Sequence, residues 1–314
     1  MGSEFAKSLV DQAGGVICPD YAPSAELLWQ SLPTEVWAVN AVAGCMAICT
    51  WALYVFQLVA AYRYIGEERI RRKVEWLIGT FPVIASCSAV AVCVPRAQPF
   101  LSTFALLYLA RTLFTFVELI RNLFGGRHEM SAVLGGQLTS PKIELASKPC
   151  CCCCICLPKL SVTPHSILAI ETLVLQVSYV RIITLFISTV MIADDPSHVN
   201  SVMVVATNYI NTISTLLAVY GTGILFRLAK DTLSPFRLKV LFTTLQVLLL
   251  CMNLQGPLID LLASTEVITC SQFLSASERA KMIQNYALVF EVFVLDLFLT
   301  LLLNPRNSAI YDNA

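Results

Sequence analysis

The stretch EVWAVNAVAGCMAICTWALYVFQLVAA, residues 35–61, decides the fold of this chain. It contains a single charged residue, Glu35, which stands at its very start. A helix of roughly 20 apolar residues crosses about 30 Å of hydrocarbon. Because a backbone in lipid must satisfy its own hydrogen bonds, an apolar stretch of this length predicts a transmembrane helix.

Further apolar segments of similar length follow, at 74–95, 99–124, 165–192, 202–229, 238–262 and 281–303. None of them shows the apolar–polar alternation of a membrane β-barrel strand. The chain is 57% hydrophobic and 13% charged, whereas soluble domains carry about 25% charged residues. The sequence therefore predicts an all-α membrane protein whose seven transmembrane helices occupy residues 35–303.

Lysine and arginine in the connections predict the orientation, since these residues gather on the cytosolic side of membrane proteins. The first, third and fifth connections are rich in them, with Arg63, Arg69, Arg71, Arg72, Lys73, Arg121, Arg127, Lys142, Lys148, Lys159, Arg227, Lys230, Arg237 and Lys239. The opposite side has Lys7, Arg96, Arg279 and Lys281. We expect an extracellular segment at 1–34, a cytosolic loop at 125–164 and a cytosolic tail at 304–314. Within the first segment, residues 1–5 resemble a cloning remnant, and Ser24–Gln30 suits a short amphipathic helix.

The expected cytosolic loop contains the run KPCCCCCICLPKL, residues 148–160. Structural zinc sites use spaced thiolates, and consecutive cysteines converge poorly on one ion. Disulfides are rare in the cytosol, whereas cysteines beside a membrane helix are typical palmitoylation targets. Each buried methylene contributes about 0.8 kcal/mol to membrane anchoring. We therefore expect covalent palmitate, and no other cofactor or metal, on Cys150, Cys151, Cys152, Cys153, Cys154 and Cys156.

Two cysteines fall in the extramembrane segments on the other side, Cys18 and Cys270. Disulfides persist in the oxidising extracellular compartment. We predict a Cys18–Cys270 disulfide that ties the N-terminal segment to the loop before the last helix. The alternative is a pair of free thiols.

Ionisable and amide side chains inside the apolar segments are the candidates for substrate contact, because such residues are costly in lipid and mark transport pathways. Arg181 and Glu291 lie deep in their segments, where an ion pair between helices is an equally good interpretation. The amides form a polar seam on later segments, with a helix break expected at Gly256-Pro257, although bonding between helices also explains them. The candidates are Glu171, Arg181, Asn208, Asn211, Gln246, Asn253, Gln255 and Glu291.

Sequence motifs for catalysis are absent. The chain has no H-E-x-x-H, Walker or G-x-S-x-G pattern, so we expect neither an enzyme nor an ATP-driven pump. The glycines at 125–127 and 134–137 are expected to form turns. Equal numbers of acidic and basic residues give no indication of a nucleic-acid partner.

Several motifs along residues 18–303 resemble the alpha subunit of the organic solute transporter family. They are the P-C-C-C-C-C run at Pro149–Cys154, Pro95-Arg96, Gly125-Gly126, the G-I-x-x-R pattern of Gly223, Ile224 and Arg227, Gln246 with Gln255, Cys270 and Glu291. The cysteine run together with seven helices is the specific part of the likeness. Ile155 and Leu157 interrupt that run, which is a departure from the family pattern.

The resemblance implies a facilitative carrier for amphipathic organic anions such as bile acids and conjugated steroids. It implies transport without sodium or ATP at the plasma membrane, basolateral in epithelia, together with a small single-span beta subunit. An endomembrane location and an alpha–alpha dimer are further arrangements that the sequence allows. An amphipathic substrate would meet membrane lipids and enter laterally, with its anion near Arg181 or the polar amides.

The alternative is a seven-helix receptor or membrane-trafficking protein without transport activity. The third segment ends in Glu118–Arg121, read as ELIR, and lacks a D-R-Y-like end. The last segment lacks N-P-x-x-Y. These absences weigh against an ordinary G-protein-coupled receptor but leave a trafficking role open.

Overall fold

The computed structural model describes residues 23–31, 33–137, 142–143, 160–194, 202–265, 267–270, 274–303 and 308–311. Its longer elements are the helices α2 (Ala25–Ser31), α3 (Thr34–Tyr64), α4 (Glu68–Ile78), α5 (Thr80–Cys93), α6 (Gln98–Leu123), α7 (Arg127–Gln137), α8 (Pro164–Asp194), α9 (Val202–Ala229), α10 (Leu238–Ser264) and α11 (Ala276–Leu302). Short 3-10 turns occupy Pro95–Ala97 and Ser234–Phe236. The two-residue strands β1 (Lys142–Ile143) and β2 (Leu160–Ser161) pair antiparallel.

Seven helical spans in the described part of the chain are long and apolar enough to cross a membrane. They run over Thr34–Tyr64, Glu68–Cys93, Pro95–Leu123, Pro164–Met191, Ala206–Ala229, Leu238–Ser264 and Ala276–Leu302. The predicted all-α fold with seven spans is therefore confirmed, and each predicted segment overlaps one of them. Large apolar side chains stay exposed on these spans, Phe186 and Leu301 among them, as expected for surfaces that meet lipid.

The second span begins earlier than predicted, at Glu68 instead of residue 74. The charged stretch that precedes residue 74 looks like a loop, yet α4 buries Ile70, Val74, Leu77 and Ile78. That spacing places apolar side chains on one helical face and charges on the other. A break at Gly79 separates α4 from α5. Pro82, three residues later, has no backbone N–H to donate to the preceding turn, which accounts for the break.

A further helix, α7, occupies part of the predicted loop at 125–164. Gly125 and Gly126 form the expected turn, with φ of +83° and +132°, and the Gly126 amide donates to the Arg121 carbonyl. Positive φ favours glycine, so this pair can end α6 where other residues would be strained. The turn predicted at 134–137 is wrong, because these residues continue α7. Met130 and Leu134, one helical turn apart, are both buried and anchor it.

The helix break expected at Gly256-Pro257 is also wrong, since α10 runs without interruption from Leu238 to Ser264. Pro257 is exposed, so its ring does not disturb a packed neighbour. The Gln284 amide lies beside Gly256, 3.2 Å from where a β-carbon would stand. A prolyl residue is tolerated within an apolar span when neighbouring groups satisfy the freed backbone.

The chain divides into two compact units. The first draws its described residues from Met1–Trp51, Pro82–Ser102 and Leu248–Val294, and the second from Ala52–Phe81, Thr103–Val247 and Leu295–Ala314. In the first unit α2 is held by Trp29, whose indole donates to the Cys93 carbonyl at 3.2 Å and whose ring packs on Trp37. The helix predicted at Ser24–Gln30 thus corresponds to α2.

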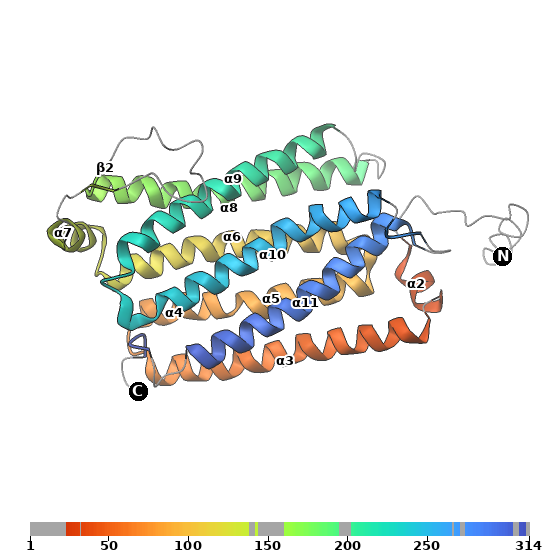
Figure 1. Cartoon of the computed structure of the whole chain (residues 1–314), viewed down its shortest axis with the longest axis horizontal. Coiled ribbons are helices and arrows are strands. Elements are labelled where there is room, and N and C mark those ends of the chain that lie inside the picture. Colours follow the sequence, from red (N-terminus) through yellow and green to blue (C-terminus); the bar gives the residue numbers. More distant parts are fainter. Residues whose placement is uncertain are drawn as a thin grey trace, which may run out of the picture. The chain divides into compact units, whose positions relative to one another are not determined.

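The second unit has an aromatic core and a close helical pair. Phe226 and Phe242 stack with ring centroids 4.0 Å apart, and Phe116 packs at 6.0 Å from Phe242. Helices α8 and α9 lie side by side (Figure 1) and approach closely at Gly221. A β-carbon at Gly221 would stand 2.9 Å from a Val174 methyl. Glycine is therefore needed for this approach, since real β-carbons essentially never come so close.

Candidate functional site

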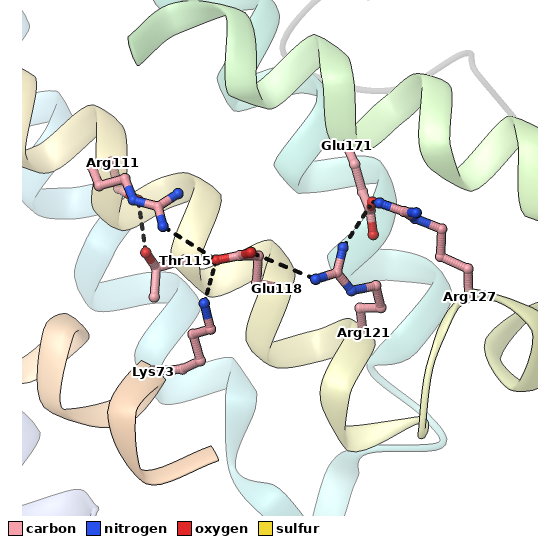
Figure 2. A network of polar contacts seen from close by, with 7 residues as sticks. All are labelled: Lys73, Arg111, Thr115, Glu118, Arg121, Arg127 and Glu171. Atoms are coloured by element: carbon pink, nitrogen blue, oxygen red, sulfur yellow. Dashed lines mark hydrogen bonds and ion pairs between the residues drawn. The ribbon is translucent and has the colours of Figure 1, made fainter. Parts of the chain in front are cut away.

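Charged side chains of the second unit form a continuous network around Glu118 and Glu171 (Figure 2). Glu118 of α6 accepts from the Lys73 ammonium at 2.6 Å and lies 3.5 Å from the Arg111 guanidinium. Arg121, one helical turn along α6, is 3.6 Å from the other Glu118 oxygen. Arg111, Glu118 and Arg121 share a face of α6 because residues three and seven positions apart lie above one another.

Glu171 of α8 receives two guanidinium groups and is almost fully buried, at 3% exposure. Arg121 donates to its Oε2 at 3.2 Å. Arg127, the first residue of α7, donates to the same oxygen through Nη2 at 2.6 Å and through Nε at 2.7 Å. Arg121 therefore joins the two carboxylates into one network, and Glu171 holds α6, α7 and α8 together.

The network has more positive than negative charge. Four cations (Lys73, Arg111, Arg121 and Arg127) surround two carboxylates, which leaves an excess of two positive charges. Two carboxylates shared among four cations cannot neutralise them. The excess makes this end of the second unit attractive to anions.

A cavity of about 500 Å³ opens beside the Glu171 end of this network. Its described walls are Arg121, Gly126, Arg127, His128, Pro164, His165 and Leu168. Two arginines and two histidines thus face the cavity, and none of these described wall residues is acidic. Its volume falls in the range of small-molecule sites, roughly 300–1,000 Å³.

A second polar feature connects α8 and α9 inside their spans. Arg181 donates from Nη2 to the Thr215 hydroxyl at 2.9 Å, and the Thr184 hydroxyl donates to the Asn211 Oδ1, also at 2.9 Å. One turn further, the Ser188 and Thr207 hydroxyls lie 3.5 Å apart. Along this series of contacts the residue numbers increase on α8 and decrease on α9, so the two helices are antiparallel. We name this set the α8–α9 ladder.

Arg181 and Asn211 of the predicted substrate set therefore lie in one buried ladder, with 6% and 9% exposure. Asn208, predicted to belong to the same polar seam as Asn211, is exposed instead. Residues three apart on a helix differ by about 60° in direction, and here that difference separates a buried from an exposed side chain.

The predicted amides of α10 behave differently from one another. Gln246 is half-buried, and its amide nitrogen is buried without a hydrogen-bond partner among the described residues. Asn253 donates to the Leu249 carbonyl of its own helix at 2.8 Å. In the first unit, Gln255 donates to the Glu291 carboxylate of α11. This Gln255–Glu291 bond connects α10 and α11, and Gln255 Oε1 and Glu291 Oε2 are buried without a partner in the described structure.

A buried carboxylate outside the predicted set connects α11 to α3. Asp296 of α11 is fully buried, and its Oδ1 accepts from Gln57 of α3 at 2.8 Å. Gln57 also donates to the Thr300 hydroxyl. The apolar run around Gln57 gives no indication of its partner, because the two residues lie 239 positions apart in the sequence.

The predicted cysteine sites lie largely outside the described residues. This holds for Cys18 and for the whole run from Cys150 to Cys156. Cys270 is described and is not among the free thiols there, which are Cys45, Cys49, Cys87, Cys93 and Cys251. Palmitoylation and the Cys18–Cys270 bond both stay predictions. Within the described ranges, no group of three or more His, Cys, Asp or Glu residues is placed to hold a metal ion.

Comparison with known proteins decides the family. The family described as "Organic solute transporter Ostalpha" matches residues 39–306, which is most of the chain. The chain belongs to the Ostalpha family. Its described spans therefore belong to a multi-pass membrane protein of a transporter family, as the sequence motifs predicted.

Relatives within the Ostalpha family cover nearly the whole chain. Organic solute transporter alpha-like protein 3 of Caenorhabditis elegans is 32% identical over 90% of this chain and 80% of its own length. Alpha-like protein 1 of the same organism is 27% identical over 98% of this chain and 79% of its own length. Organic solute transporter subunit alpha of Homo sapiens is 24% identical over 88% of this chain and 82% of its own length. No solved structure gives a significant match.

Proposed function

We propose that this Ostalpha-family chain carries amphipathic organic anions, such as bile acids and conjugated steroids, across the plasma membrane. Transport runs down the electrochemical gradient and uses neither sodium nor ATP. Membership of a family whose members are named organic solute transporters supports the transport role. The charge distribution inside the spans supports the choice of anions.

The observation that carries the anionic specificity is the position of Arg181. It is buried within the span Pro164–Met191, where placing a guanidinium costs about 2.5–3.5 kcal/mol on insertion scales. The α8–α9 ladder gives it a hydroxyl partner in Thr215. Exposed apolar side chains on the same helix, Ile182 and Phe186, offer a surface for a sterol body. A substrate that enters from the bilayer would thus place its anion near a fixed positive charge.

The assembly that we propose includes a small single-span beta-type subunit. The vertebrate relatives are named "subunit alpha", which supports a partner. The basolateral plasma membrane is the proposed location in epithelia, with the N-terminus outside and the C-terminus in the cytosol. An alpha–alpha dimer is compatible with this arrangement.

Two covalent features complete the proposal. Palmitate on the run Cys150–Cys156 would anchor its loop to the bilayer, and hydroxylamine treatment should then lower the mass of that peptide. A Cys18–Cys270 disulfide would fix the extracellular segment, and peptide mapping without reductant should recover the two cysteines linked. An unchanged peptide mass would contradict palmitoylation, and two free thiols would contradict the disulfide.

Uptake measurements on Arg181 variants test the proposed specificity. The full chain is expressed with a beta-type partner, and uptake of a steroid sulfate is compared with uptake of the uncharged steroid. We expect Arg181→Gln to lower sulfate uptake at least tenfold while the uncharged steroid is little affected, and Arg181→Lys to retain part of the activity. Arg227→Gln, which removes an exposed arginine at the end of α9, is the matched control. Equal loss of both substrates at constant surface expression would contradict a role in anion recognition.

A further inference from the structure

We propose that the cavity between the beginnings of α7 and α8 is a binding site for a phosphate monoester, presented by the headgroup of an anionic membrane lipid. The site is distinct from Arg181 and the α8–α9 ladder. It is built by residues at the end of α6 and at the beginnings of α7 and α8.

The charge of the cavity walls favours an anion. The cavity walls include Arg121 and Arg127, which share the single carboxylate of Glu171. Arg121 also lies 3.6 Å from a Glu118 oxygen, but Lys73 and Arg111 share that carboxylate with it. Two positive charges of the network are thus without a carboxylate of their own. A phosphate dianion carries the charge that balances this excess, and arginine is well suited to bind it with two parallel hydrogen bonds.

Backbone N–H groups at two helix N-termini also favour an anion in this cavity. The walls contain Gly126, which precedes α7, together with the first residues of α7 (Arg127 and His128) and of α8 (Pro164 and His165). The first amides of a helix have no acceptor inside it and carry partial positive charge, which favours anions at that end. One α8 amide is already capped, since the Ser166 N–H donates to the Thr163 hydroxyl at 3.2 Å. Pro164 has no N–H to donate, so the remaining backbone donors at the cavity belong to His165 and to the first residues of α7, after the Gly125-Gly126 turn.

Position and size favour a lipid headgroup. Arg121 lies at the end of the span Pro95–Leu123, and Pro164 begins the span Pro164–Met191. The cavity is therefore at the depth where headgroups meet the ends of transmembrane helices. Leu168, exposed on α8, gives an apolar wall on the side of the span. A water molecule takes roughly 30 Å³, so about 500 Å³ holds a sugar-sized headgroup and not merely a bare ion.

Lipid retention by the purified full chain tests this site. Protein in phosphatidylcholine nanodiscs is supplied with phosphatidylinositol 4-phosphate and, in a parallel sample, with phosphatidylinositol, and bound lipid is counted by native mass spectrometry. We expect the phosphorylated lipid to be retained in preference to the unphosphorylated one. Arg127→Gln should weaken retention about tenfold, which corresponds to about 1.4 kcal/mol. Arg227→Gln, the exposed control outside the cavity, should bind like the unmodified chain.

A second variant keeps the test independent of folding. His128 and His165 are both exposed, so His128→Ala combined with His165→Ala should leave the fold intact and still lower retention several-fold. Competition with inorganic phosphate and with inositol 1,4-bisphosphate separates the sources of the phosphate. Displacement by the inositol phosphate and not by inorganic phosphate supports a headgroup site, whereas equal displacement by inorganic phosphate overturns the lipid assignment. Retention that is unchanged in both the Arg127→Gln and the double histidine variants overturns the site. Transport is not the readout, so the outcome is independent of the proposed function.

Discussion

Glu171 illustrates what a single residue does in this protein and how far the sequence could predict it. Its position in an apolar segment indicated importance and made it a candidate for substrate contact. The structure places it between Arg121 and Arg127, as the acceptor that joins three helices. Its partners lie 50 and 44 residues away. No local sequence pattern predicts such pairs, because they depend on how α6, α7 and α8 pack against one another.

Replacing Glu171 should destabilise the protein. Glu171→Gln removes the negative charge from a nearly buried carboxylate and leaves two guanidinium groups facing each other. Breaking a buried ion pair typically costs 3–5 kcal/mol; since Arg121 and Arg127 are partly exposed, we expect about 2 kcal/mol. Thermal unfolding of the purified chain in detergent should show a midpoint lowered by a few degrees.

Glu129→Gln is the control for this measurement. Glu129 is an exposed carboxylate in the first turn of α7, so its replacement changes the net charge by the same amount without opening a buried pair. The midpoint should stay within about a degree of the original, as for ordinary surface substitutions. Equal midpoints for Glu171→Gln and Glu129→Gln would show that the network does not stabilise the fold.

At the scale of elements, the long apolar helices were predictable and the short charged ones were not. Apolar runs such as 35–61 and 202–229 are longer than the roughly 20 residues that cross a bilayer as a helix, so their length and composition alone predict transmembrane helices. The first half of α4, before residue 74, was missed because its charges hide the apolar face that Ile70 shares with Val74 and Leu77. Helix α7 was missed because it contains two glycines near its end, which resemble a turn. In both helices the burial of a few apolar residues outweighs the charges or glycines that locally indicate a loop or a turn.

The pairing of α8 with α9 gives a sharp prediction at this scale. Gly221→Ala should destabilise the protein by about 1–3 kcal/mol, because the new methyl group would lie 2.9 Å from Val174 and force the helices apart. Gly223→Ala lies on the same helix, where nothing is within 4 Å of the added carbon. That control should be neutral or stabilising by about 0.5–1 kcal/mol, since alanine favours helix more than glycine does. Thermal unfolding of the two variants measures the difference, and similar midpoints would contradict the close approach.

At the scale of the whole molecule, the sequence predicted family and span number, and the orientation stays a prediction. The count of lysine and arginine in the connections places the first, third and fifth connections in the cytosol. The Cys18–Cys270 disulfide and the palmitoylated loop both depend on this orientation, because their chemistry requires opposite compartments.

Epitope accessibility in intact cells measures the orientation. A tag at the N-terminus should be stained by antibody without permeabilisation, while a tag at the C-terminus should be stained only after it. The reason is the excess of basic residues on the side of the C-terminus. Staining of the C-terminal tag on intact cells would reverse the orientation and, with it, the compartments assigned to the cysteines.

The central claim is that the chain carries organic anions across the membrane, and flux through reconstituted protein tests it most directly. Purified chain is placed in liposomes with and without a single-span beta-type partner, and entry of a radiolabelled steroid sulfate is followed without sodium or ATP. We predict saturable flux down the gradient that greatly exceeds that of protein-free liposomes when the partner is present. Flux no greater than in protein-free liposomes with every partner supplied would contradict the claim and favour a trafficking role.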